Sequence, residues 1–116
     1  MSSTPLHYLD LTELSAQLRS GALSPVAVTE TMLTRIAELD PTLLSYVTTM
    51  ADSAREEAKA AEREIAAGRY RGPLHGVPLA VKDLCDATGV RTSAGMPHVR
   101  AKIAPATSDA TVVARL

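Results

Sequence analysis

The sequence predicts an α/β fold in which helices alternate irregularly with short strands. Two observations support this prediction. Apolar residues recur at helical spacing in three segments between residues 10 and 68, each bounded by residues typical of helix ends. Residues 43–50 are rich in β-branched side chains, and residues 79–81 form a short apolar run behind a Gly/Pro turn, so both read as strands.

The first helix has a clear start and a clear stop. Asp10 followed three residues later by Glu13 predicts a capping box at the start of the helix. Gly21 is predicted to lie just beyond the last turn and to end the helix. Between them, one helical face carries the apolar side chains Leu11, Leu14 and Leu18. We expect this face to point into a core.

The second helix is predicted to start at Ser24, as the cap, with Pro25 in the first helical position. Its apolar face repeats every four residues, at Val28, Met32 and Ile36. We expect the helix to end at Asp40, because the residue before a proline, here Pro41, is pushed out of helical geometry.

A third helix is predicted after the 43–50 strand, from a cap at Asp52 or Ser53 to about Ala67, with Gly68 as its stop. Its inner face is a narrow stripe of small residues that would let it lie close to a sheet: Ala54, Ala58, Ala61 and Ile65. Its other side carries charges that we expect to be solvated: Arg55, Glu56, Lys59, Glu62, Arg63 and Glu64.

Composition indicates a chain that packs against more protein than its own 116 residues. Hydrophobic residues make up 46% of the sequence, but there is no Phe or Trp and aromatic residues reach only 3%. Few large side chains are therefore available for a self-sufficient core. We expect the chain to associate with itself or with the remainder of a larger domain.

Charge and cysteine content narrow the class of protein. A formal net charge of −1 gives no electrostatic footprint for nucleic acid or an anionic membrane. The first eight residues lack a signal-peptide pattern, and no run approaches the ~18 apolar residues of a membrane span. The single cysteine, Cys85, fits a reducing compartment. We expect a cytoplasmic protein.

The stretch from Gly72 to Leu84 contains the main candidate for a reactive side chain. This is Lys82, which directly follows the apolar run at residues 79–81. A lysine closing a buried strand is either held by a partner, such as Asp83 or Asp86, or kept neutral as a proton acceptor, since burial lowers the pKa of a lysine. Position alone favours the structural interpretation. The other reactive side chains, His75, His98 and Cys85, are expected to be structural, and the histidines lack metal-ligand spacing, so we expect no metal and no cofactor.

Residues Gly72 to Leu84, Gly-Pro-Leu-His-Gly-Val-Pro-Leu-Ala-Val-Lys-Asp-Leu, resemble the block that carries the catalytic lysine of the amidase signature family. Residues 18–24, the Arg35–Pro41 region and Asp109 to Val113 also resemble that family, so the resemblance covers almost the whole chain. It implies an amino-terminal part of one domain, residues 1–116, with a helical region at about 10–68 and a lysine strand with loops at about 72–116. The implied fold is a mixed sheet between helical layers.

The resemblance implies that Lys82 is one member of a Ser-cisSer-Lys triad that hydrolyses the C–N bond of a small carboxamide through an acyl-enzyme. In that family both serines belong to a Gly-Gly-Ser-Ser-Gly-Gly block, which these 116 residues lack. We therefore expect the chain to be inactive alone. At Thr92 to Met96 relatives often have Thr-Thr-x-Gly-Ser, so the second and last positions differ here.

Two alternatives remain open. The chain is a truncated, non-catalytic interaction module in which Lys82 is only structural, or it is the amidase-like subunit of a glutamyl-tRNA amidotransferase. The Leu-His-Gly turn at residues 74–76 favours a free-standing amidase over that subunit.

Overall fold

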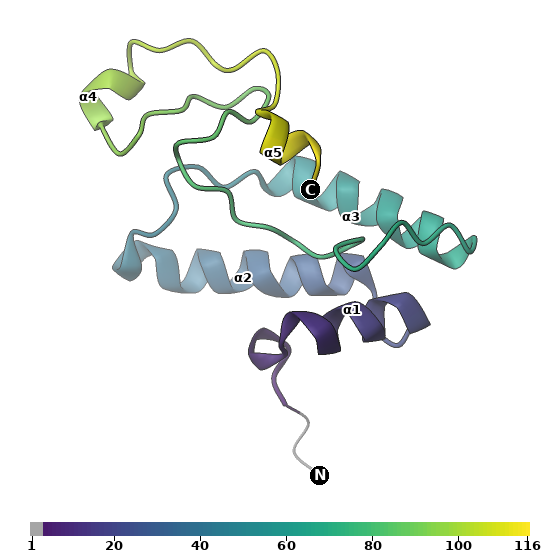
Figure 1. Ribbon diagram of the computed structural model, residues 1–116. Coiled ribbons are helices and arrows are strands. Elements are labelled where there is room, and N and C mark those ends of the chain that lie inside the picture. Colours follow the sequence, from purple (N-terminus) through teal and green to yellow (C-terminus); the bar gives the residue numbers. More distant parts are fainter. Residues whose placement is uncertain (1–3) are drawn as a thin grey trace. The chain divides into compact units, whose positions relative to one another are not determined.

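The computed structural model describes residues 4–116, so the first three residues of the stretch tested for a signal peptide lie outside the described part. The elements in Figure 1 are a 3-10 turn and five helices: η1 (Leu6–Tyr8), α1 (Leu11–Ser20), α2 (Pro25–Leu43), α3 (Ala51–Ala66), α4 (Pro97–Arg100) and α5 (Thr111–Ala114). The chain divides into two compact units, one up to Pro78 and the other Leu79–Leu116.

The expected α/β fold class is wrong, because residues 4–116 contain helices and loops but no strand. A strand needs a neighbour whose backbone pairs with it, and the described residues supply no such neighbour to either predicted strand. Residues 44–50 instead form an exposed connection between α2 and α3. Leu79 and Val81, expected to be buried, are 49% and 43% exposed.

The core of the first unit lies between η1, α1 and α2. Leu14 and Leu18 of α1 pack against Val28 of α2, and both Leu18 and Val28 are completely buried. Four partly buried side chains surround this cluster: Leu6, Leu9, Leu23 and Val77. Part of each predicted apolar face therefore lies in this core, whereas Leu11 is 51% exposed and Met32 and Ile36 lie outside the cluster.

The predicted helix starts are confirmed for α1 and α2. The carboxylate of Asp10 accepts from the backbone N–H of Glu13 at 2.8 Å, and Glu13 Oε2 accepts from the N–H of Asp10 at 3.2 Å. Ser24 Oγ accepts from the N–H of Ala27 at 3.1 Å, with Pro25 in the first turn. Gly21 ends α1 with a φ of +76°, as the stop signal requires.

Helix α2 runs three residues past its predicted end, through Pro41 to Leu43. Asp40 accounts for the difference, because it closes the last turn from both its backbone and its side chain. Its carbonyl accepts from the N–H of Leu44 at 2.8 Å, and its Oδ1 accepts from the N–H groups of Ser45 and Tyr46 at 2.6 and 3.1 Å. These bonds satisfy backbone donors that follow the helix end.

Helix α3 packs along α2 rather than on a sheet (Figure 1). Ala58 and Ala61, from the predicted small-residue stripe, are buried. Half of the charged face that we expected to be solvated instead makes contacts outside α3. Arg55 Nε lies 2.7 Å from Glu30 Oε1 on α2, Ser24 Oγ donates to Glu62, and Glu64 binds the segment that follows α3.

The second unit is held together by hydrogen bonds between its loops. Ala106 accepts from the N–H of Gly89 and donates to the carbonyl of Val90, both at 2.8 Å. Asp109 accepts from the N–H and the hydroxyl of Thr88 at 2.7 and 2.8 Å. These two bonds lower the pKa of Asp109, the backbone bond contributing most. Across residues 4–116, no helix is both long enough and apolar enough to cross a bilayer.

Candidate functional site

Lys82 lies at the start of a tight turn in the second unit. Its carbonyl accepts from the N–H groups of Leu84 and Cys85 at 2.7 and 3.0 Å, which places Asp83 and Leu84 at the corner of the turn. The Lys82 side chain is exposed, and it makes no hydrogen bond or ion pair to any of residues 4–116. The backbone around this lysine is therefore fixed while its amine is left open.

The expected partners of Lys82 bind other groups. The carboxylate of Asp83 accepts hydrogen bonds from Ser93 and Gly95, and Oδ1 of Asp86 accepts from the hydroxyl of Thr92 at 2.6 Å. The structural interpretation, in which an aspartate next along the chain pairs with the lysine, therefore has no support within the described residues. The burial that we expected at Lys82 is also missing there, since no strand forms before it.

The carboxylate of Asp83 is the most heavily bonded side chain near Lys82. Oδ1 accepts from the backbone N–H of Ser93 at 2.8 Å, and Oδ2 accepts from the Ser93 hydroxyl at 2.5 Å and from the N–H of Gly95 at 3.1 Å. These bonds, with the Ser93 hydroxyl contributing most, lower the pKa of Asp83 to about 2. Asp83 is therefore a carboxylate at neutral pH.

The turn that precedes Lys82 is anchored to α3 of the first unit by His75. The N–H of Arg71 donates to His75 Nδ1 at 3.1 Å, and the guanidinium of Arg71 lies 3.2–3.3 Å from Nε2 of the same ring. Nε2 lies 3.0 Å from Oε2 of Glu64, and Arg71 Nε lies 3.0 Å from the same oxygen. The His75 side chain is only 3% exposed, so its role here is structural, as the sequence led us to expect.

Tyr70 adds a second anchor for the same segment. Its hydroxyl lies 3.0 Å from Ser15 Oγ on α1, and the guanidinium of Arg19 sits 5.3 Å from the centre of its ring. The start of the Gly72–Leu84 stretch is thus attached to both α1 and α3.

The remaining candidates from the sequence stay apart from Lys82. His98 is exposed on α4, and Cys85 is a half-buried free thiol. Within residues 4–116 no hydrogen bond joins Lys82 to a serine, and no three His, Cys, Asp or Glu side chains are grouped so as to hold a metal ion. The geometry that would activate a nucleophile is therefore not assembled by these residues.

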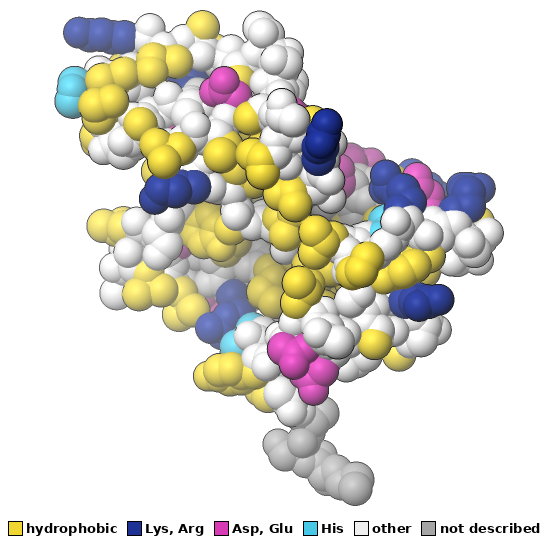
Figure 2. Space-filling model, in the orientation of Figure 1, with side chains coloured by type: hydrophobic (Ala, Val, Ile, Leu, Met, Phe, Trp, Pro, Cys, Tyr) yellow, Lys and Arg dark blue, Asp and Glu magenta, His cyan; other side chains and the backbone are white. Residues whose placement is uncertain are grey.

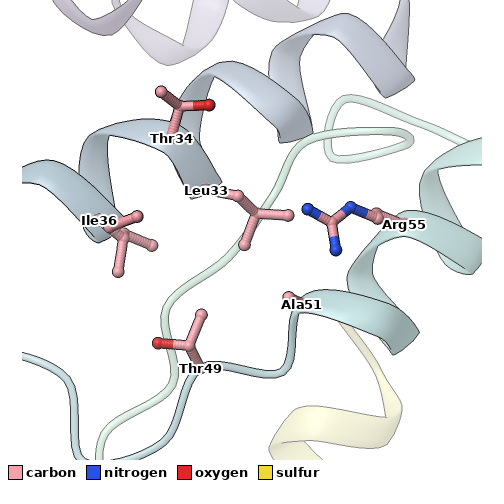
Figure 3. Close-up of a pocket in the computed structure, with 7 residues that line it drawn as sticks. Leu33, Thr34, Ile36, Thr49, Ala51 and Arg55 are labelled. Carbon is pink, nitrogen blue, oxygen red and sulfur yellow. The ribbon is translucent and has the colours of Figure 1, made fainter.

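A pocket in the first unit, drawn in Figure 3, lacks the groups that chemistry needs. Figure 3 shows the Arg55 guanidinium at its edge facing Leu33, and that guanidinium is already bound to Glu30. The other lining residues are aliphatic or carry only a hydroxyl: Thr34, Ile36, Ala37, Thr49 and Ala51. We do not assign this pocket as an active site.

Sequence reasoning missed the bonding of Asp83 to the turn at residues 93–96 and the Glu64–Arg71–His75 cluster. Asp83 and Gly95 are 12 residues apart in the sequence, and Glu64 and His75 are 11 residues apart. No periodic pattern links either pair. The only available signal was the aspartate directly after the lysine, which we had weighed as a partner of the lysine.

Comparison with known proteins identifies what this chain is similar to. The amidase family model matches residues 27–116. AmiD of Mycobacterium tuberculosis, which is named as an amidase, is 48% identical over 93% of this chain and 22% of its own length. A glutamyl-tRNA(Gln) amidotransferase subunit from Azotobacter vinelandii is 45% identical over 96% of this chain and 22% of its own length.

The solved structure of peptide amidase PAM, in complex with the competitive inhibitor chymostatin, superimposes with a TM-score of 0.85 at 37% identity. The match covers 97% of this chain and 23% of that one. The chain therefore spans about a fifth of the length of the relatives that it matches. This chain belongs to the amidase signature family and corresponds to an amino-terminal portion of it.

Proposed function

We propose that this chain is part of an amidase that hydrolyses the C–N bond of carboxamides, to which it contributes Lys82 as the general base. The observation that carries the proposal is the state of Lys82. Its amine is unpaired within the described residues, while both neighbouring aspartates are occupied by other groups. A lysine that no carboxylate holds in its protonated form can lose its proton once water is excluded, and can then act as a base.

The residues around Lys82 explain how its amine would become a base. Leu79, Val81 and Leu84 flank it in the sequence and are 49%, 43% and 60% exposed. Whatever covers these apolar side chains also removes water from the lysine, and desolvation disfavours the charged form of an amine. The proposed chemistry therefore requires a further part of the protein to close over this stretch.

Exposed apolar side chains are widespread on this chain, as the yellow areas in Figure 2 show. Within residues 4–116 the buried hydrophobic core comprises five residues, whereas the exposed large hydrophobic residues number more than twice as many. We propose that the rest of an amidase domain covers them, since the relatives match over only 22–23% of their own length. The 116-residue chain on its own is then expected to bind an apolar dye and to associate. A monomer with a cooperative melt and no dye binding would overturn this.

The general-base role is tested in the full-length protein encoded by the reading frame that carries this chain. Ammonia release from primary carboxamides and peptide amides is measured for the wild type and for Lys82→Ala. Loss of a general base costs about 10²- to 10⁴-fold in rate. Lys102→Ala, an exposed lysine of the same unit, is the matched control and retains the wild-type rate. An undiminished rate in Lys82→Ala contradicts the proposal.

The reading frame itself separates the enzyme from the interaction module. A Gly-Gly-Ser-Ser-Gly-Gly block encoded after Leu116 supplies the nucleophile and the oxyanion hole that an amidase needs. A stop codon directly after Leu116 favours the non-catalytic module instead.

The amidotransferase subunit is the second candidate function, because that class of relative matches almost as well as AmiD does, at 45% against 48% identity. Glutamine is the diagnostic substrate. Ammonia release from glutamine that depends on added partner subunits would favour the amidotransferase, and release from simple carboxamides by the isolated protein would favour the free-standing amidase.

A further inference from the structure

We propose that Asp83 is a positioning residue for Lys82, acting through a clamp that its carboxylate forms with the turn at residues 93–96. This inference rests on the proposed function, because it assigns a role to Asp83 only through Lys82. It adds a residue that neither the sequence pattern nor the resemblance assigned to the reaction.

The clamp holds the turn from both oxygens of one carboxylate. The three donors are the N–H and the hydroxyl of Ser93 and the N–H of Gly95, at 2.8, 2.5 and 3.1 Å. Ser93 is 3% exposed, so its hydroxyl is shielded from water that would compete for it. Bonds of an ionised carboxylate to such donors are among the stronger hydrogen bonds in proteins.

The turn has a backbone that needs external support. Ala94 has a φ of +50° and Gly95 a φ of +75°, and the N–H of Met96 donates to the carbonyl of Ser93 at 2.9 Å. A left-handed alanine is unfavourable and persists where its surroundings enforce it. Asp83 bonds on either side of Ala94, at Ser93 and at Gly95, and so supplies that support.

The clamp reaches Lys82 through one peptide bond. Lys82 and Asp83 begin the same turn, which is closed by the bonds from the N–H groups of Leu84 and Cys85 to the Lys82 carbonyl. With the Asp83 side chain bonded at three points, the backbone of Asp83 and of the adjacent Lys82 is restrained. Asp83 therefore limits where the lysine amine can be placed, while the amine itself stays unpaired.

The carboxylate of Asp83 accepts hydrogen bonds from the 93–96 turn and forms no ion pair with Lys82. An aspartate beside a lysine is usually read as its ion-pair partner, and pairing would hold the amine in its protonated form. Here the carboxylate oxygens face the 93–96 turn, so Asp83 can position Lys82 without holding its proton.

The test compares Asp83→Asn with a matched control in the full-length protein. Asparagine keeps the shape of the side chain but loses one acceptor oxygen and the charge. We expect kcat to fall about 10- to 100-fold with little change in KM, because misplacing a catalytic group by about 1 Å costs up to about 10²-fold. Asp86→Asn is the control: it makes the same chemical change three residues along, and the only side-chain bond that it affects is the one from the Thr92 hydroxyl. It keeps wild-type kcat.

A double-mutant cycle distinguishes positioning from general stabilisation. If Asp83 acts through Lys82, Asp83→Asn has no further effect on the residual rate of Lys82→Ala. A merely structural role predicts that the two losses multiply, which would overturn the inference. Should Asp83→Asn fail to fold, Ser93→Ala removes a single clamp bond and is expected to lower kcat about 3- to 10-fold, with unchanged kcat again overturning the inference.

The outcomes separate this inference from the proposed function. Full activity in Lys82→Ala refutes the general base whatever Asp83 does. Loss of activity in Lys82→Ala together with wild-type kcat in Asp83→Asn refutes the clamp and leaves the general base in place. Amide hydrogen exchange in the 116-residue chain adds a direct measure, because Asp83→Asn is expected to speed exchange at Ser93 and Gly95, and unchanged exchange there counts against the clamp.

Discussion

Gly76 is the residue of the Gly72–Leu84 stretch whose replacement we expect to be most damaging to the first unit. A Cβ at this position would lie 2.9 Å from Cγ and 3.2 Å from Cβ of Pro25, and 3.5 Å from Ile65. The Pro25 ring is fused to the backbone at the start of α2, so it cannot rotate away. The φ of Gly76 is +84°, which any other residue adopts only under strain.

Both effects enter the expected cost of Gly76→Ala. The left-handed backbone costs about 1–2 kcal/mol, and the reduced freedom of the unfolded chain returns about 0.4–1 kcal/mol. Overpacking against Pro25 adds about 1–3 kcal/mol. The total loss in the free energy of unfolding is therefore about 1–5 kcal/mol, with the contact to Pro25 as the larger part.

Gly21→Ala is the matched control, because Gly21 has a φ of +76° and a Cβ added there would meet no other side chain or backbone atom within 4 Å. It carries only the backbone effect, about 1 kcal/mol or less. Urea unfolding followed by helical circular dichroism measures both variants in the same unit. If Gly76→Ala is destabilised no more than Gly21→Ala, the packing of the turn on Pro25 is not as described and the reasoning fails.

Three further predictions concern the core, the His75 anchor and the Asp83 clamp. Leu18→Ala removes a completely buried side chain and is expected to lower the free energy of unfolding by about 2–5 kcal/mol, measured in urea, whereas a loss below about 1 kcal/mol would contradict the core assignment. His75→Phe leaves the backbone N–H of Arg71 without its acceptor and removes the imidazole beside Glu64, at an expected cost of about 1–3 kcal/mol in the same assay, and unchanged stability would refute the anchor. Because the folded-state pKa of Asp83 lies below its ordinary value of 3.8, at about 2, its stabilisation is present above pH 4 and is lost as pH falls towards 2. Protection of the Ser93 amide, taken as its exchange rate relative to that of an unstructured amide at the same pH, should fall across that pH interval, and protection that persists unchanged to pH 2 would argue against the clamp.

The helices were predictable because their signals are local. The capping box of Asp10 with Glu13, the Ser24 cap and the stop at Gly21 each depend on residues within four positions of one another, and each forms as expected. The end of α2 was not predictable from Pro41 alone, because Asp40 bonds forward to residues 44–46 and extends the last turn. A side chain that binds residues beyond the helix end leaves no periodic signal.

The strands were not predictable in this chain, since composition reports the preference of a segment and not the presence of its partner. Residues 43–50 and 79–81 have side chains suited to a sheet, but no described segment pairs with them. In the candidate site, too, features with a local sequence signal were predicted and features that depend on distant residues were not. Lys82 was predicted as a site residue from its local block, whereas the bonds of Asp83 to Ser93 and Gly95 depend on how two turns meet.

The exposure of Lys82 and the exposure of the apolar residues around it have one physical explanation. An amine in water stays protonated, and a catalytic lysine needs a site from which water is removed. Leu79, Val81 and Leu84 are the side chains through which a covering segment would gain free energy, at about 25 cal/mol for each Å² of apolar surface buried. The same contact would desolvate Lys82, because that residue lies between Val81 and Leu84 in the chain. Burial of the apolar neighbours thus offsets the cost of desolvating the amine, while the Asp83 clamp keeps the backbone in place before and after the site is covered.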